Sequence, residues 1–357
     1  MSSLDVPPLM KAVVTQPNRT ALVQQVPVAM PGDNEILVQV KTVAINPTDW
    51  KHLKFICNVG TICGADYAGE VVKIGPRQDP NFSLKVGDRV AGIVHGGVHK
   101  DQGAFAEYVK ADPAITWKVP DSISYEEAVT VSVGVLTCIQ AMFHPKRLGL
   151  VQYPNRVPDQ PWILIYGGST AVGHYAIQLA RLSGFRVVTT ASPRNHGLMR
   201  RLGAKAVFNY RDPNIVKKIK DVTGDSVHIV LDAYSEEESQ LICIKAFGPG
   251  GGRLMLVQHE APYIRRLRKD VTVQSTMLYS VFGRPYMMMG KTYEADPADR
   301  VQLIDYLRNT LPEHLRKGLL RPVKVHLWDG GLEKITDGFQ HMIQGRVSAE
   351  KLVFRIT

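Results

Sequence analysis

Residues 162–173 read WILIYGGSTAVG, a short apolar run followed by a glycine turn and the beginning of a helical pattern. In this order Gly167, Gly168 and Gly173 allow the backbone to bend tightly and to approach a pyrophosphate, while a helix N-terminus points at its negative charge. The glycine fingerprint requires this context, after a strand and before a helix. The structural alternative is a glycine turn that binds nothing. The stretch predicts a dinucleotide site near the middle of the chain.

Strand and helix patterns alternate after this stretch, which predicts a doubly wound parallel sheet of the Rossmann type. We assign this domain to residues 160–289. The predicted strands are 162–166, 186–190, 206–209, 227–232 and 253–257, and the helices between them include 172–183 and a segment near 214–222.

The first part of the chain carries short β-rich runs separated by turns, typical of a barrel-like domain. Strands are expected at 35–43, 69–74 and 89–94, with a loop at 60–67 and a helix at 124–142. The tail, from 290 to 357, is expected to rejoin this domain, so the β-rich substrate domain comprises 1–159 and 290–357. A proline-containing segment, 144–161, reads as a surface insertion or linker.

Bulk properties are those of a globular protein. The 357 residues are 45% hydrophobic and 21% charged, and the four cysteines contain no C-x-x-C pair. No apolar run approaches the roughly 20 residues of a membrane helix, and no secretory signal is seen, so we expect a cytoplasmic protein with no membrane partner. The formal charge of +10 comes from scattered basic residues without a nucleic-acid-binding signature. We therefore expect no nucleic acid.

The residues after the second strand favour NADPH over NADH. A NAD site usually has an acid there for the ribose 2′-hydroxyl, yet no Asp or Glu occurs between Gln160 and Arg211. Ser192 and Arg194 offer a hydroxyl and a guanidinium where a 2′-phosphate would lie, and Tyr210 adds a phenol. Alternatively, Ser192 is a helix N-cap and Arg194 a solvated helix residue.

A zinc site is not expected. Catalytic zinc needs three converging Cys, His or acid ligands, and residues 90–115 contain no cysteine. His95 and His99 lie on a glycine-rich loop that we expect at the surface. Cys57 and Cys63 are expected to be small buried side chains.

The order of these motifs resembles the zinc-free branch of the medium-chain dehydrogenase/reductase superfamily. The resemblance rests on INPTDWK (45–51), GADYAG (64–69), QGAFAEY (102–108), YGGSTAVG (166–173) and GRVSAEKLV (345–353). Within that branch the chain looks most like the fungal trans-acting enoyl reductases of polyketide biosynthesis, a part of secondary metabolism. These stand-alone enzymes work beside a polyketide synthase or a synthase–peptide synthetase hybrid. The resemblance implies a GroES-like catalytic domain beside the Rossmann domain, and the insertion 144–161 favours a monomer.

The resemblance also implies which residues meet cofactor and substrate. Thr170 departs from the family, because a glycine is common there. The implied cofactor contacts are Thr48, Asp49, Trp50, Lys51, Gly167, Gly168, Ser169, Thr170, Ala171, Val172, Gly173, Ser192, Pro193, Arg194, Asn195, Tyr210, Ser348 and Ala349, and the residues that border substrate are Thr137, Cys138, Ala141 and His144.

The implied reaction is NADPH-dependent reduction of an α,β-unsaturated acyl thioester, whose enolate oxygen needs a nearby donor. Lys51 is a candidate for ordering the nicotinamide ribose or relaying a proton, or is a plain surface lysine. Thr137 donates to the nicotinamide carboxamide, or bonds its own preceding turn. Asn46 is expected to hold its loop through bonds to the backbone. Two other functions remain open: reduction of free quinones or enones, and cofactor binding without turnover.

Overall fold

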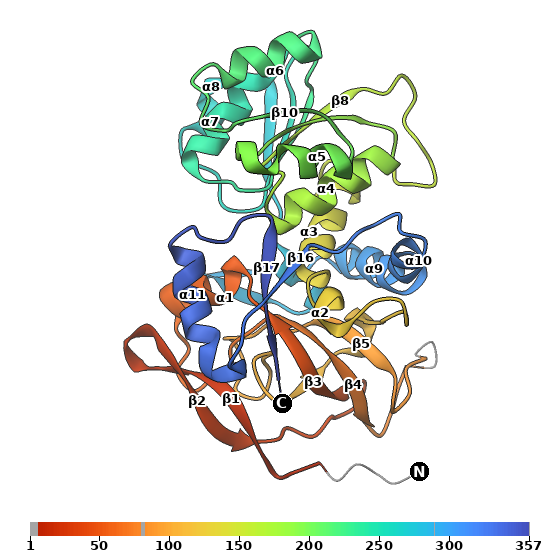
Figure 1. Cartoon of the computed structure of the whole chain (residues 1–357), viewed down its shortest axis with the longest axis vertical. Helices are drawn as coiled ribbons and strands as arrows, with labels where there is room; N and C mark the ends of the chain where they lie inside the picture. The colour runs from red at the N-terminus through yellow and green to blue at the C-terminus, as the bar shows by residue number, and fades with distance from the viewer. Residues whose placement is uncertain (1–5, 80–82, 289, 357) are drawn as a thin grey trace. The chain divides into compact units, whose positions relative to one another are not determined.

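Two units with separate cores make up the chain in the computed structural model, which describes residues 6–79, 83–288 and 290–356 (Figure 1). The first unit comprises Met1–Val133, Tyr279–Gly318 and Pro322–Thr357, and the second comprises Gly134–Leu278 and Leu319–Arg321. The tail thus belongs largely with the N-terminal residues.

The unit boundaries differ from those expected from the sequence, which were 159/160 and 289/290. Residue 289 itself lies outside the described residues. Residues 134–143 belong to the second unit because Gln140 is bonded within it: its Nε2 donates to the Met277 carbonyl (3.2 Å) and its Oε1 accepts from the Thr276 hydroxyl (2.5 Å). Short-range sequence patterns do not carry such contacts, since the partners lie more than 130 residues apart.

A six-stranded parallel sheet forms the centre of the second unit. Its order, β10-β9-β8-β11-β12-β13, is the 3-2-1-4-5-6 order of a dinucleotide-binding sheet and confirms the predicted Rossmann fold. All five residues of β8 are buried, as in a parallel sheet covered on both faces. The strands are β8 (Trp162–Tyr166), β9 (Arg186–Thr190), β10 (Ala204–Phe208), β11 (Ile229–Asp232), β12 (Gly252–Leu256) and β13 (Val271–Ser275), and the helices are α4 (Ala171–Leu182), α5 (His196–Leu202), α6 (Ile215–Thr223), α7 (Glu237–Ala246) and α8 (Ile264–Leu267).

The first unit is built on a mostly antiparallel sheet in the order β16-β17-β3-β4-β5-β7, with β6 also pairing with β3. This is the expected β-rich domain. The strands of the unit are β1 (Leu9–Gln16), β2 (Thr20–Pro27), β3 (Ile36–Ala44), β4 (Asp66–Ile74), β5 (Arg89–Ile93), β6 (Tyr108–Ala111), β7 (Thr116–Lys118), β14 (Tyr286–Met288), β15 (Lys291–Tyr293), β16 (Lys324–Leu327) and β17 (Glu350–Arg355).

Short helices connect these strands. One of them, α1 (Pro47–Lys51), continues directly into a π-helical turn, His52–Ile56. The other helices are α2 (Tyr125–Ala128), α9 (Pro297–Asp305), α10 (Leu311–Arg316) and α11 (Ile335–Ile343), while α3 (Ser132–Phe143) begins in the first unit and continues in the second.

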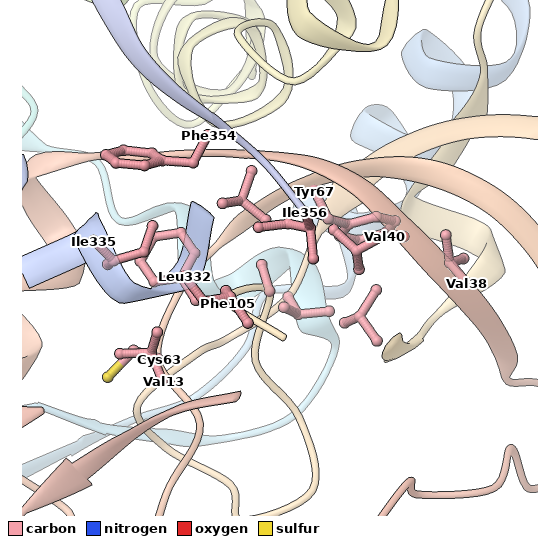
Figure 2. Close-up of a cluster of buried hydrophobic side chains, with 14 of the residues drawn as sticks. Val13, Val38, Val40, Cys63, Tyr67, Phe105, Leu332, Ile335, Phe354 and Ile356 are labelled. Atoms are coloured by element: carbon pink, nitrogen blue, oxygen red, sulfur yellow. The ribbon is translucent and has the colours of Figure 1, made fainter. Parts of the chain in front are cut away.

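The core of the first unit brings the two ends of the chain together (Figure 2). Val13 from β1 and Phe354 from β17 belong to one buried cluster, with Phe105 from the loop before β6 and Ile335 from α11. Phe105 and Phe339 approach with ring centroids 6.1 Å apart. This burial explains why the tail joins the N-terminal unit.

Two local expectations are wrong. The strand predicted at 69–74 begins earlier, at Asp66, so part of the expected loop 60–67 belongs to β4. The helix expected at 124–142 is broken between Ala128 and Ser132. The charged Asp66 is unusual in a strand, so the sequence pattern does not indicate one there. Its tertiary partners, described below, offset the cost of burying its carboxylate.

The helical stretch Tyr125–Phe143 qualifies by length and composition as a membrane span, alone among the residues that the structure describes. However, 83% of its most apolar window is buried inside the protein. A core helix of a soluble protein passes the same test, so this stretch is weak evidence for a membrane.

Candidate functional site

The glycine turn joins β8 to α4 and is held against the end of β9. Gly167 has a φ of +78°, a left-handed conformation that glycine adopts without strain. Its N–H donates to the Thr190 hydroxyl (2.9 Å), and the Gly168 N–H donates to the Thr190 carbonyl (2.9 Å). The turn is therefore anchored by the last residue of the neighbouring strand.

Thr170 replaces the glycine common in the family and caps α4. Its hydroxyl accepts the Gly173 N–H (3.0 Å). The preceding Ser169 is half-buried, as are Ala171 and Val172, the first two residues of the helix. No carbonyl of the helix can accept the N–H groups of Ala171 and Val172, and the helix dipole favours an anion there. The departure at Thr170 thus preserves a turn that fits a pyrophosphate.

The candidate adenosine-phosphate residues follow β9 and β10 at the same edge of the sheet, since parallel strands end together. Pro193 and Arg194 are exposed, Ser192 is half-buried and Asn195 is buried. Ser192 occupies an N-cap position, but its hydroxyl makes no capping bond to the short helix that follows, so it is available to a ligand. Tyr210 is half-buried, and the Arg211 guanidinium lies 4.7 Å from its ring centroid. Arg211 is a second cation at this edge that sequence analysis missed.

In the first unit, α1 begins at a buried network that sequence analysis did not foresee. The Asn46 amide donates to the Asp66 carboxylate (2.8 Å), and the Asn46 side chain also accepts the backbone N–H of Asp49 in a capping box, so the expected bond to the backbone is present. The Asn46 N–H donates to the Asp49 carboxylate (2.7 Å). Asp49 is buried, so its carboxylate shapes the start of α1 and is not exposed to a ligand. Lys351 forms an ion pair with Asp66.

Burial raises the pKa of Asp49 to about 7, and the nearby Asp66 charge adds to this, against the Asn46 N–H and Lys351, which lower it. An acid with a raised folded-state pKa stabilises the fold fully below its unfolded pKa of 3.8, and this contribution is lost as the pH rises through about 7. Asp49→Asn keeps an oxygen for the Asn46 N–H and buries no charge. We therefore expect this variant to gain stability relative to the natural protein between about pH 4 and about pH 8, by roughly 4 kcal/mol. Urea unfolding across that range tests it, and a pH-independent difference would contradict it.

The other α1 candidates lie among aromatic rings. The Trp50 indole N–H is buried and has no hydrogen-bond partner among the described residues. The Lys51 ammonium lies 5.6 Å from the Trp50 ring centroid. The Thr48 hydroxyl is bonded to the Tyr279 hydroxyl and to His52 Nδ1 (3.0 Å). Sequence analysis missed Tyr279, because 231 residues separate it from Thr48.

His95 is buried, not on a surface loop as expected. Its ring stacks on Tyr279 (centroids 4.1 Å apart, planes 10° apart) and on Phe282 (5.3 Å, 6°). Burial lowers its pKa well below the usual range, so the ring is neutral. Cys57 and Cys63 were expected to be small buried side chains; Cys63 is buried, but Cys57 is only half-buried. Among the described residues no group of three or more His, Cys, Asp or Glu side chains could hold a metal ion.

The four substrate candidates, three on α3 and His144 just after it, are all buried. The Cys138 thiol donates to the Val172 carbonyl (3.0 Å), and burial raises its pKa, which makes it an inert packing group. Ala141 is fully buried, while Thr137 retains slight exposure. His144 Nδ1 accepts the Lys146 N–H (3.2 Å) at the end of the helix. Of the four, Thr137 is the one that carries a hydroxyl.

Ser348 and Ala349 immediately precede β17. Ala349 has a φ of +55°, uncommon for a residue other than glycine. Lys351 lies two residues after Ala349 and pairs with Asp66, which also binds Asn46 at the start of α1. The Asp66–Lys351 pair therefore connects this segment to α1. The structure thus brings together Thr48–Lys51 and Ser348–Ala349 within the first unit, and the glycine turn, Ser192–Asn195 and Tyr210 within the second.

A further missed residue is Tyr234, after β11. A Cβ on Gly167 would lie 3.3 Å from the Tyr234 Cβ, so Tyr234 borders the turn at the point where the strand order reverses. Ligands bind at such switch points in doubly wound sheets. The sequence carried a signal for Tyr234, because it follows the predicted strand 227–232 and residues just after such strands border the ligand. Within the second unit, the glycine turn and the switch point beside it fit a nicotinamide dinucleotide.

Comparison with family models matches both units. The model described as an alcohol dehydrogenase GroES-like domain matches residues 32–121, and the model described as a zinc-binding dehydrogenase matches residues 171–290. The second description names zinc, whereas no group of three or more His, Cys, Asp or Glu side chains that could hold a metal ion occurs among the residues that the structure describes.

Curated relatives match over almost their whole length. The chain is 38% identical to the trans-enoyl reductase ACTTS2 of Alternaria alternata over 350 residues, which is 97% of this chain and 98% of that protein. It is 37% identical to the trans-enoyl reductase FSL5 of Gibberella zeae (93% of both chains) and 36% identical to the trans-enoyl reductase resD of Aspergillus sclerotiorum (97% of this chain, 100% of that one).

Solved structures share the fold. A putative zinc-dependent alcohol dehydrogenase from Rhizobium etli superposes with a TM-score of 0.77 at 23% identity, covering 98% of both chains. The CurK enoyl reductase superposes with a TM-score of 0.75 at 20% identity, over 98% of this chain and 100% of that one. The quinone oxidoreductase of Coxiella burnetii gives 0.74 at 23% identity, over 98% and 100%.

Proposed function

Because the chain belongs to the trans-enoyl reductase group of the medium-chain dehydrogenase/reductase superfamily, we propose that it is an NADPH-dependent enoyl reductase. Its substrate is an α,β-unsaturated acyl thioester carried by a polyketide synthase or a synthase–peptide synthetase hybrid. The observation that carries this proposal is the 38% identity to a trans-enoyl reductase over 97% of the chain. The proposal extends to a monomeric enzyme in the cytoplasm.

The cofactor, when bound, supplies a hydride to the carbon β to the thioester carbonyl. The residues of this chain bind and orient. The N–H groups of Ala171 and Val172 are directed at the pyrophosphate, and Ser192, Arg194 and Tyr210 at the 2′-phosphate. Charge that develops on the thioester oxygen needs a donor before the α-carbon takes up a proton.

Lys51 and Thr137 are the proposed polar groups near the reacting atoms. Lys51 orders the nicotinamide ribose or relays a proton, and its half-buried ammonium beside the Trp50 ring supports a defined position. Thr137 donates to the nicotinamide carboxamide. Reduction itself needs no nucleophile, and the Cys138 thiol, bonded to a carbonyl, has no part in it.

The first test compares consumption of reduced cofactor with a short 2-enoyl pantetheine thioester and with a simple quinone. We expect turnover of the thioester with NADPH and little with NADH. Turnover of the quinone alone would replace the proposal with quinone reduction. Bound NADPH with turnover of neither, even with the partner synthase present, would leave a non-catalytic cofactor-binding protein.

The cofactor preference is tested by Arg194→Ala. Arg194 is exposed just after β9, and no acid occurs from Pro161 to Tyr210 to bind a ribose 2′-hydroxyl instead. A bond from a guanidinium to a phosphate contributes about 1.5–3 kcal/mol, so we expect the NADPH dissociation constant to rise roughly 10- to 100-fold, with NADH binding unchanged.

The matched control is Arg200→Ala, an exposed arginine on α5 outside the Ser192–Asn195 segment. It should leave both dissociation constants unchanged. Equal loss of NADPH and NADH binding in Arg194→Ala would contradict the assignment of the 2′-phosphate to this residue. Isothermal titration with each cofactor makes the comparison.

A further inference from the structure

Asp66 is a fully buried carboxylate whose two oxygens bind three donors. Oδ1 accepts the Val133 N–H (3.0 Å) in the first turn of α3, and Oδ2 accepts the Asn46 amide (2.8 Å). Oδ2 also pairs with the ammonium of Lys351, which is 3% exposed. Asn in place of Asp66 would offer one oxygen for these donors and turn an NH₂ group toward another, so only a carboxylate satisfies all three donors together.

The three donors come from segments far apart in the sequence. Asn46 begins α1, which carries Thr48–Lys51, while Lys351 lies in β17, two residues after Ala349. The main chains of these two segments also meet, because the Ile45 N–H donates to the Leu352 carbonyl (3.1 Å). Asp66 is therefore the point at which two segments with proposed cofactor contacts are joined through side chains.

Stability alone does not account for such a pair. Two charges removed from water lose hydration that their attraction only partly restores, so a buried ion pair is often no better for stability than apolar residues of similar size. What the pair provides is geometry. Lys351 pairs with Asp66 Oδ2, and the Asn46 amide donates to the same atom, so a shift of either α1 or the start of β17 would break one of these bonds.

We propose that Asp66 and Lys351 are positioning residues that hold Thr48–Lys51 and Ser348–Ala349 in the arrangement that binds the cofactor. Both side chains are buried, so they would act through the two segments and not by contact with a ligand. The inference rests on the proposed function, because it takes those two segments as cofactor contacts.

The test removes the pair in two ways. Lys351→Met leaves the carboxylate without its cation. Asp66→Asn with Lys351→Met removes both charges, so this double variant buries no unpaired charge and is expected to fold where the single variant does not. In both, we expect faster hydrogen exchange in peptides covering 45–52 and 346–352, measured without cofactor, and an NADPH dissociation constant at least roughly tenfold higher.

Two controls separate positioning from general loss of stability. Arg355 lies on β17, as Lys351 does, and forms an ion pair with Glu126 of α2. Arg355→Met breaks this ion pair and should change neither the hydrogen exchange nor the NADPH dissociation constant. Leu332→Ala truncates a core residue of the same unit without touching Asp66, and should lower the urea midpoint while leaving NADPH binding within about twofold.

The outcomes are distinct. Raised exchange in the two segments together with weakened NADPH binding, beyond that of Leu332→Ala, supports the inference. Wild-type NADPH binding in the folded double variant, or equal effects in Leu332→Ala, overturns it. A natural protein that binds NADH in place of NADPH refutes the proposed cofactor preference instead, and the same comparison is then made with NADH.

Discussion

Gly173→Val is expected to abolish detectable NADPH binding, a loss of roughly a hundredfold or more in affinity. A Cβ at Gly173 would lie 2.2 Å from the Gly167 carbonyl oxygen and 2.7 Å from the Gly168 Cα. Both are backbone atoms of the turn and cannot rotate away as a flexible side chain can. The turn and the start of α4 must therefore separate, which moves the Ala171 and Val172 N–H groups away from a pyrophosphate.

The matched control for this substitution is Gly197→Ala. Gly197 lies on α5 with an ordinary φ, and a Cβ there would meet only the Arg201 guanidinium, at 3.5 Å. Alanine is the better helix former by about 1 kcal/mol, so this variant should be as stable as the natural protein or slightly more stable. Titration with NADPH, together with circular dichroism to establish folding, makes the comparison. Tight NADPH binding by folded Gly173→Val would show that the pyrophosphate does not lie at this turn.

Phe354→Ala is expected to destabilise the first unit by about 3–5 kcal/mol. Phe354 is fully buried in β17 and belongs to the core that joins the two ends of the chain (Figure 2). Its ring packs beside Trp328 (centroids 6.2 Å apart), and its Cζ would lie only 2.8 Å from a Cβ on Gly338. The closeness of Gly338 shows how tightly the ring is enclosed, so its removal leaves a cavity that neighbours fill only partly.

Phe55→Ala is the same chemical change at a surface position, where the ring is 53% exposed. We expect this substitution to lower the free energy of unfolding by less than about 1 kcal/mol. Tryptophan fluorescence during urea unfolding reports mainly on the first unit, which holds Trp50, Trp117 and Trp328, while Trp162 lies in the second. Similar losses in Phe354→Ala and Phe55→Ala would mean that β17 is not part of the structural core.

Much of the second unit was predictable because its signals are local. The run 162–166 is β8 with the predicted bounds, and 186–190 is β9 with the predicted bounds. The glycine turn lies between β8 and α4, as its strand-turn-helix pattern indicated. Where the predicted boundary of an element was wrong, a tertiary contact determined the observed one. Asp66 extends β4 into an expected loop because Lys351 and Asn46 bind its carboxylate.

The candidate residues likewise divide into those with a local sequence signal and those that only tertiary contacts identify. Ser192 and Arg194 were found from their place after a strand and from the missing acid, both of which are visible in the chain. Asp49 was taken as a cofactor contact on resemblance, and its burial assigns the carboxylate to the start of α1. Tyr279 and Lys351 had no local signal, since their partners Thr48 and Asp66 lie 231 and 285 residues away.

The sequence by itself determined the parallel sheet, its glycine turn and the kind of ligand that the turn suits. These depend on hydrophobic period, on glycine's backbone freedom and on helix polarity, all of which act over a few residues. Only the tertiary structure decided which polar groups are buried together: Asp66 with Asn46 and Lys351, and His95 between aromatic rings. The cost of burying a charge or a polar group is offset only by a partner that chain folding delivers, and no local pattern specifies that partner.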